Sequence, residues 1–181
     1  MLDNTFQGGF MVSNSERSDV KKASFWVSQL VIIIATVGGV YLAASQGLKQ
    51  AIQFDSIRSE QNNYYLRKSL QNELGDNVGY IRDYINKVNQ RVANPTLDLE
   101  TFVWNSMTYS STALETPSDL LRDAQRFYHQ VDEIMKGAAA VPVKNKALED
   151  LAKRIESEVL PKFEADTKRI KDRLAAKNID V

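Results

Sequence analysis

The order of apolar and polar residues divides this chain into one unbroken apolar run and a longer amphipathic remainder. Residues 25–44 read FWVSQLVIIIATVGGVYLAA and contain no charged side chain. A helix rises about 1.5 Å per residue, so this run covers the roughly 30 Å hydrocarbon core of a bilayer. Phe25, Trp26 and Tyr41 lie near its ends, where aromatic rings favour the headgroup region. The pattern predicts a transmembrane helix over residues 25–44, retained as a signal anchor.

Two other interpretations of this apolar run stay open. The small residues Ala43, Ala44 and Ser45 resemble a signal-peptide cleavage site, although the apolar part of a signal peptide is usually only about 7–15 residues long. A buried helix of a soluble protein is the other alternative. Such a helix is usually shorter and interrupted by charges, so we favour the membrane anchor.

The rest of the chain is predicted in three parts around the span. Residues 1–24 are rich in Ser, Asn, Gly and charge and have no apolar period, which predicts a disordered N-terminal tail. A docking peptide built on Phe6, Phe10 and Met11 is the alternative for this tail. Residues 45–63 are expected to continue the membrane helix as a stalk, and residues 64–181 to form a helical bundle domain.

The first helix of the bundle domain is indicated by apolar residues that recur every three or four positions, as on one face of a helix. Gly75 and Gly79 lie within this stripe, and each costs up to about 1 kcal/mol relative to Ala, so a kink or break is expected there. Asn94-Pro95 is expected to end the helix, because proline disfavours helical backbone at the residue before it. The stripe consists of Leu66, Leu70, Leu74, Val78, Ile81, Ile85, Val88 and Val92.

Three further helices are predicted. One covers residues 97–114, and a second covers residues 117–136, where Thr116-Pro117 is a start signal and Gly137 a stop signal. After a loop over residues 137–143, the last runs over residues 144–177 with an expected kink at Pro161. Amphipathic helices with short connections predict an all-α protein whose extramembrane part is an antiparallel bundle of about four helices.

Composition narrows the classes of partner. The chain has 23 basic and 23 acidic residues and no cysteine. A balanced charge does not favour nucleic acid as a partner. Without cysteine there are no disulfides. Acidic residues outnumber basic ones over residues 97–136, and basic residues outnumber acidic ones over residues 144–177. These opposite charges favour packing of the two segments against each other within the domain. The alternative is a chance asymmetry on solvent-exposed helix faces.

The sequence predicts no catalytic, cofactor-binding or metal-binding residues. The only histidine, His129, precedes Asp132 and Glu133 by one helical turn, and two ligands are half a metal site at best. We expect His129 to pair with Glu133 on the surface. The chain lacks a nucleophile elbow and a phosphate-binding glycine loop, so we do not expect an enzyme.

Two groups of residues are candidate contact sites. Ala35, Gly39, Ala43 and Gly47 recur every fourth residue, and such a ridge of small residues lets two membrane helices approach closely. The alternative is that these residues simply face lipid. Tyr64 and Tyr65 are adjacent, so they point about 100° apart and at least one is expected to be exposed or at an interface. They pack within the domain or contact a partner.

These patterns favour a single-pass, membrane-anchored helical interaction or scaffold protein, which acts on a protein partner or on a second copy of itself. An extracytoplasmic ligand-binding or sensor module, passing its signal to a partner, is the alternative. Arg17, Lys21 and Lys22 precede the run whereas Lys49 and Arg58 follow it. This slight excess of bases predicts a cytoplasmic N-terminus and an extracytoplasmic C-terminal domain.

Overall fold

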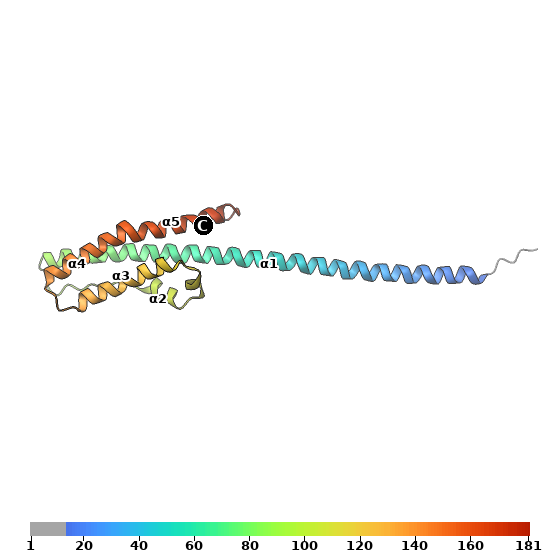
Figure 1. Ribbon diagram of the computed structural model, residues 1–181, viewed down its shortest axis with the longest axis horizontal. Coiled ribbons are helices and arrows are strands. Elements are labelled where there is room, and N and C mark those ends of the chain that lie inside the picture. Colours follow the sequence, from blue (N-terminus) through green and yellow to red (C-terminus); the bar gives the residue numbers. More distant parts are fainter. Residues whose placement is uncertain (1–13) are drawn as a thin grey trace, which may run out of the picture. The chain divides into compact units, whose positions relative to one another are not determined.

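The computed structural model describes residues 14–181, and every regular element in this part of the chain is a helix (Figure 1). This confirms the predicted all-α class. Contacts divide the chain into two compact units, residues 1–53 and 54–181, which are described separately. In chain order the elements are α1 (Asn14–Asn89), α2 (Phe102–Thr108), the 3-10 helix η1 (Ser111–Glu115), α3 (Ser118–Lys136), α4 (Val141–Arg154), the π-helix η2 (Ile155–Val159) and α5 (Leu160–Ala175).

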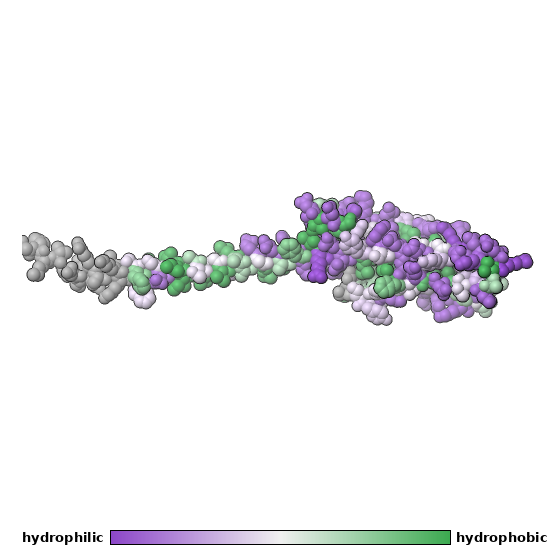
Figure 2. Space-filling model, turned by 180° about the vertical axis from the view of Figure 1, so that it is seen from behind, coloured by the Kyte–Doolittle hydropathy of each residue, from purple (hydrophilic) through white to green (hydrophobic). Residues whose placement is uncertain are grey.

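The first unit contains the N-terminal part of α1. Its apolar side chains from Phe25 to Ile52 are exposed, and Figure 2 shows a mainly hydrophobic surface along this helix. Among the described residues, one stretch is long and apolar enough to span a membrane, and none of it is buried. A buried core helix would be mostly covered, so the exposure disfavours that alternative. The stretch is compatible with a transmembrane or signal-anchor helix.

The N-terminal limit of α1 differs from the sequence-based expectation. The helix begins at Asn14, so residues 14–24 of the predicted tail are helical. No proline or glycine lies between Asn14 and the apolar run, and a helix that is already nucleated extends readily through such residues. The tail residues 1–13, including the proposed docking peptide of Phe6, Phe10 and Met11, lie outside the described residues.

The second unit is organised on the C-terminal part of α1. Leu70, Leu74, Val78 and Ile81 from the predicted stripe are buried in its core. Of the kink or break expected at Gly75 and Gly79, the break is wrong, since α1 is continuous to Asn89, and a kink stays a prediction. Leu74, Val78 and Ile81, which precede or follow the glycines along the helix, are buried in the core. Their packing outweighs the low helix propensity of the two glycines.

The C-terminus of α1 closes with a Schellman motif. The amide of Val92 donates to the carbonyl of Lys87 at 3.0 Å, and the amide of Arg91 donates to Val88 at 3.1 Å. Arg91 has a φ of 56°, in the left-handed region that favours glycine. The helix therefore ends at Asn89, a few residues before the predicted stop at Asn94-Pro95.

The segment between α1 and α3 is less helical than predicted. The expected helix over residues 97–114 is replaced by an extended stretch, the short helix α2 and the 3-10 helix η1. Before α2, Pro95, Leu97 and Leu99 are partly buried and alternate with exposed residues, a period of two that is typical of extended backbone. Side chains of α1 hold this stretch in place, as described below.

The remaining helices agree closely with the sequence pattern. Helix α3 begins at Ser118, one residue after the predicted start at Pro117, and it ends before Gly137 as predicted. The last predicted helix is a continuous run of α4, η2 and α5, and its predicted apolar face is buried. The buried residues of that face are Leu148, Leu151, Ile155, Val159, Phe163, Ile170 and Leu174. The run begins at Val141, so the last three residues of the predicted loop over residues 137–143 are helical.

Pro161 has a local structural consequence. A proline has no amide hydrogen, so the carbonyl of Ser157 lacks its usual helical donor. Directly before Pro161 the chain forms the π-helix η2, in which the amide of Leu160 donates to the carbonyl of Ile155, five residues earlier. The predicted irregularity in the last helix therefore takes the form of a π-bulge, one of the known causes of helix kinks.

In the described part of the chain, four ion pairs connect α1 with η2, with α5 and with Lys177 just after α5, and one of them joins Arg173 and Glu60 at 3.8 Å. Arg82 binds Glu156 through two hydrogen bonds of 2.6 and 2.5 Å. Arg67 binds Asp166 at 2.5 Å, and Lys177 binds Glu60 at 2.8 Å. Phe127 and Phe163 are fully buried and, with the α1 residues above, fill the core shared by these helices.

We predict that Arg91→Gly stabilises the second unit. Left-handed backbone costs a residue with a side chain roughly 1–2 kcal/mol, and glycine avoids this cost. Glycine also gives the unfolded chain more conformational freedom, which offsets part of the gain in stability. The expected gain in the free energy of unfolding is about 0.5–1 kcal/mol, a few degrees in Tm, measured by circular dichroism of the purified protein.

Arg126→Gly is the matched control, since it makes the same change at an exposed position inside α3. There the backbone is right-handed helix, in which glycine is among the least favourable residues. The control is therefore expected to lower the stability by about 0.5–1 kcal/mol. Equal effects of the two changes would contradict the strain assigned to Arg91.

Candidate functional site

The small-residue ridge lies in the first unit and is open. Ala35, Gly39, Ala43 and Gly47 are all exposed. An ideal Cβ atom built on Gly39 or Gly47 meets no atom within 4 Å outside its own stretch of helix among the described residues. The ridge is therefore free to receive a second helix. That it does so stays a prediction.

The tyrosine pair lies at the start of the second unit. Tyr64 is half-buried, whereas Tyr65 is 53% exposed. Their rings contact each other edge to face, with centroids 5.3 Å apart and an interplanar angle of 72°. One of the two is therefore exposed, as adjacent residues on a helix require. A partner contact through this pair stays a prediction.

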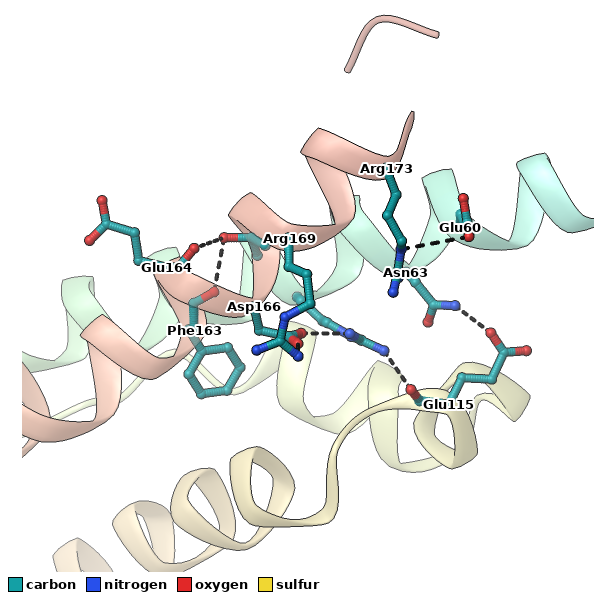
Figure 3. A network of polar contacts seen from close by, with 10 residues as sticks. Glu60, Asn63, Glu115, Phe163, Glu164, Asp166, Arg169 and Arg173 are labelled. Carbon is teal, nitrogen blue, oxygen red and sulfur yellow. Dashed lines mark hydrogen bonds and ion pairs between the residues drawn. The ribbon is translucent and has the colours of Figure 1, made fainter. Parts of the chain in front are cut away.

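Sequence reasoning missed a buried polar cluster centred on Arg67 of α1. Figure 3 shows the residues around it, among them Asn63, Glu115, Asp166 and Arg169. The Arg67 guanidinium donates to Asp166 of α5 at 2.5 Å and to the backbone carbonyl of Glu115 in η1, also at 2.5 Å. Arg169 approaches the second oxygen of Asp166 at 3.7 Å. Arg67 is only 6% exposed, so the ion pair lies in a largely water-free environment where an unpaired charge is very costly.

Glu115 extends this cluster toward the start of the second unit. Its carboxylate accepts hydrogen bonds from Asn63 and from Ser59, the latter at 2.9 Å. These two donors, assisted by the positive charge of Arg67, hold the pKa of Glu115 below its usual value of 4.5. Glu115 therefore attaches η1 to three successive turns of α1.

A second buried polar cluster surrounds Glu73 of α1. Its carboxylate accepts the backbone amides of Val103 and Trp104, at 2.5 and 3.0 Å, and so caps the N-terminus of α2. The hydroxyl of Tyr128 in α3 donates to the same carboxylate at 2.6 Å. Burial, and then the hydrogen bond to Glu73, raise the pKa of Tyr128 far above its usual value. Glu73, which is 4% exposed, thus joins α1 to both α2 and α3.

Asn77, one turn further along α1, holds the extended stretch before α2. Its side-chain amide donates to the carbonyl of Glu100 and accepts the amide of the same residue, both at 2.7 Å. This pairing resembles that of two backbone amides in a β-ladder, which explains why the backbone is extended here. Tyr80 donates to the carboxylate of Glu100 at 2.7 Å, and this hydrogen bond raises the pKa of Tyr80.

A spacing signal for these polar residues is present in the sequence. Asn63 and Arg67 precede Leu70 by seven and three positions, and Asn77 follows Leu74 by three, so all three lie on the apolar stripe at helical spacing. Glu73 adjoins the stripe at Leu74. Treating the stripe as a purely apolar surface hid the fact that polar residues occupy part of it.

The candidate chemistry around His129 is confined to the surface. His129 Nδ1 lies 3.3 Å from Glu133 Oε1, which confirms the expected pair, and both side chains are exposed. Among the described residues no group of three His, Cys, Asp or Glu side chains is arranged to hold a metal ion. Beside this pair, an open groove of about 390 Å³ lies between α3 and α4, lined in part by Glu133, Asp150 and Arg154.

Comparison with protein-family models, with curated proteins and with solved structures gave no match to this chain. The buried carboxylates Glu73 and Asp166 are occupied by amide, hydroxyl and guanidinium donors of the same unit. Such groups hold segments together rather than face a substrate. Open surfaces of the described chain include the exposed helix of the first unit, the tyrosine pair and the groove between α3 and α4.

We predict that Glu73→Ala strongly destabilises the second unit. The change leaves the amides of Val103 and Trp104 and the hydroxyl of Tyr128 without their acceptor, and we expect a loss of about 3 kcal/mol in the free energy of unfolding by denaturant titration. Asp76→Ala, on the exposed face of the same helix, is the control and should change the stability by less than about 0.5 kcal/mol. A loss for Glu73→Ala as small as that of the control would show that the cluster is not formed.

We also predict that Glu115 makes stability depend on acid. Because its pKa is lowered in the folded state, its contribution is present above pH 4.5 and is lost as the pH falls through the lowered value. The stability difference between the native protein and Glu115→Gln should therefore be larger at pH 6 than at pH 3. Glu158→Gln, at an exposed position, is the control and should show little difference at either pH. A stability difference between the native protein and Glu115→Gln that does not change with pH would contradict the prediction.

Proposed function

We propose that this protein is a single-pass, membrane-anchored helical interaction or scaffold protein. The observation that carries the proposal is the fully exposed apolar stretch of α1, about as long as a bilayer core is thick, on the helix that also supplies the core of the second unit. In water such a surface would be unfavourable, whereas lipid would cover it. The lipid bilayer is thus the first proposed partner, and a protein or a second copy of this chain is the other.

We further propose that the second unit is an antiparallel bundle. The ion pairs between α1 and the last helical run support this arrangement, because their order is reversed along the two segments. Arg82, Arg67 and Glu60 of α1 pair with Glu156, Asp166 and Lys177, respectively. Acidic and basic residues from distant parts of the chain thus meet in this unit.

The proposed orientation places the N-terminus in the cytoplasm and the second unit outside it. Its support is the slight excess of Arg and Lys before the apolar run. The open ridge of small residues supports self-association of the proposed span, because close approach of the backbones improves the van der Waals packing that contributes to affinity between helices in lipid.

An extracytoplasmic ligand-binding or sensor module is the second candidate. The groove between α3 and α4 favours it, since its volume of about 390 Å³ lies within the range of small-molecule sites. Arg154 donates to Gln130 there at 3.1 Å, and Glu133 and Asp150 leave the lining mixed in charge. A ligand would bind the folded state and raise the Tm of the second unit.

We predict that Gly39→Leu weakens self-association in a bilayer. A leucine on the ridge keeps the two backbones apart, and we expect the dissociation constant to rise at least about tenfold, equivalent to about 1.4 kcal/mol. Fluorescence energy transfer between donor- and acceptor-labelled protein in liposomes measures it. The chain contains no cysteine, so one introduced cysteine carries each label.

Gly38→Leu is the matched control, since it makes the same change one residue away, about 100° around the helix from the ridge. Its dissociation constant should change far less. Equal weakening by both variants would contradict the ridge as the contact surface. A protein that is monomeric before any change would overturn self-association, and a protein that does not enter the bilayer would overturn the membrane anchor.

A further inference from the structure

The segment between α1 and α3, residues 95–116, is attached to α1 by several buried polar groups. We refer to these residues as the strap. Over the part of α1 whose side chains the structure describes, the four buried polar ones are Asn63, Arg67, Glu73 and Asn77, and each of them hydrogen-bonds to the strap. On the strap, the contacts are made by Glu100, by the first amides of α2 and by Glu115.

The apolar attachment of the strap consists mainly of side chains that pack against the core while only partly buried, namely Leu97, Leu99, Val103, Trp104 and Ala113. Met107 is its one fully buried apolar side chain among the described residues, whereas α3 alone buries four. Trp104 adds a stacked contact with Tyr128, with ring centroids 5.5 Å apart. Three large apolar side chains of the strap instead face outward, with Phe102 81%, Tyr109 93% and Leu114 92% exposed.

The polar groups beneath the strap lower the free energy needed to move it away from α1. Apolar side chains that lose their cover are exposed to water at a cost proportional to their area. Asn77 and Glu73 would exchange hydrogen bonds within the protein for hydrogen bonds to water. Exposing them therefore costs less free energy than exposing apolar side chains. The face of α1 that the strap covers therefore tolerates exposure better than the face of Leu70 and Leu74.

Both ends of the strap are marked by breaks in regular structure. Before it, Arg91 and Asn94 have left-handed backbone, with φ of 56° and 49°. After it, Pro117 precedes the first residue of α3 and supplies no amide hydrogen to a continuing helix. Within it, helical structure is limited to α2 and η1, of seven and five residues. Changes in backbone angles at the two ends would move the strap without disturbing α1 or α3.

We propose that the strap opens as a unit while α1, α3, α4 and α5 remain packed together. Local openings of this kind have free energies below that of global unfolding, and they occur where apolar burial is sparse. Opening uncovers the polar face of α1 and frees Trp104 and Met107 from the core. The strap is thus a conformational device of the second unit, independent of whether the first unit spans a membrane.

Amide hydrogen exchange of the full chain in detergent micelles, read by NMR or mass spectrometry, tests this proposal. The informative amides are those of Glu100, Val103 and Trp104, which are hydrogen-bonded to α1 side chains in the closed state. We expect them to exchange at least tenfold faster than amides at the centres of α3 and α5. Equal rates in the strap and in α3 and α5 would overturn the proposal, because they would mean that the strap opens only in global unfolding.

Asn77→Ala provides a second test. It removes both hydrogen bonds to Glu100, and we expect about tenfold faster exchange in the strap with less than twofold change in α3 and α5. Arg82→Ala, which removes an exposed ion pair between α1 and η2, is the matched control and should leave the strap unchanged relative to α3. Uniformly faster exchange in all helices of Asn77→Ala, or no change in the strap, would contradict a separate opening. If Asn77→Ala does not fold, the native protein's exchange rates decide the question alone.

Discussion

The contacts of the Arg67 guanidinium connect three segments that are far apart in the sequence. One end of the group binds Asp166 of α5, and the other binds the carbonyl of Glu115 in η1. Arginine stays charged in proteins, and a buried charge without partners is very unfavourable. The fold is therefore stable only when neighbouring segments place a carboxylate and a carbonyl beside the guanidinium. The Arg67–Asp166 pair, together with Arg82–Glu156 and Lys177–Glu60, fits one register of the last helical run along α1.

The other buried polar residues of α1 act in the same way on shorter segments. Glu73 determines where α2 starts, because its carboxylate accepts the first amides of that helix. Asn77 determines that the backbone at Glu100 is extended. The apolar core supplies most of the driving force for folding, and the polar contacts select one arrangement among several that would bury similar areas. Helix α1 thus combines an exposed apolar stretch with a template for the second unit.

The parts of the fold that follow from periodicity were predictable. The buried faces of α3 and of the last helical run match the apolar stripes, and Gly137 ends α3 as expected. The failures have a common cause. At Gly75 and Gly79 packing outweighed local propensity, and over residues 97–114 the contacts to Glu73 and Asn77 replaced most of the expected helix. Such contacts depend on residues distant in the sequence, and their spacing along α1 carries only an indirect signal.

A double-mutant cycle on Arg67 and Asp166 tests most directly whether this pair organises the second unit. The variants are Arg67→Met, Asp166→Leu and the double variant, and the free energy of unfolding is measured for each. We predict a loss of about 3–5 kcal/mol for each single change, because each leaves a buried charge without its partner. The double variant should recover most of the loss, with a coupling energy above about 2 kcal/mol. Additive losses, or single changes that cost less than about 0.5 kcal/mol, would contradict the role given to Arg67.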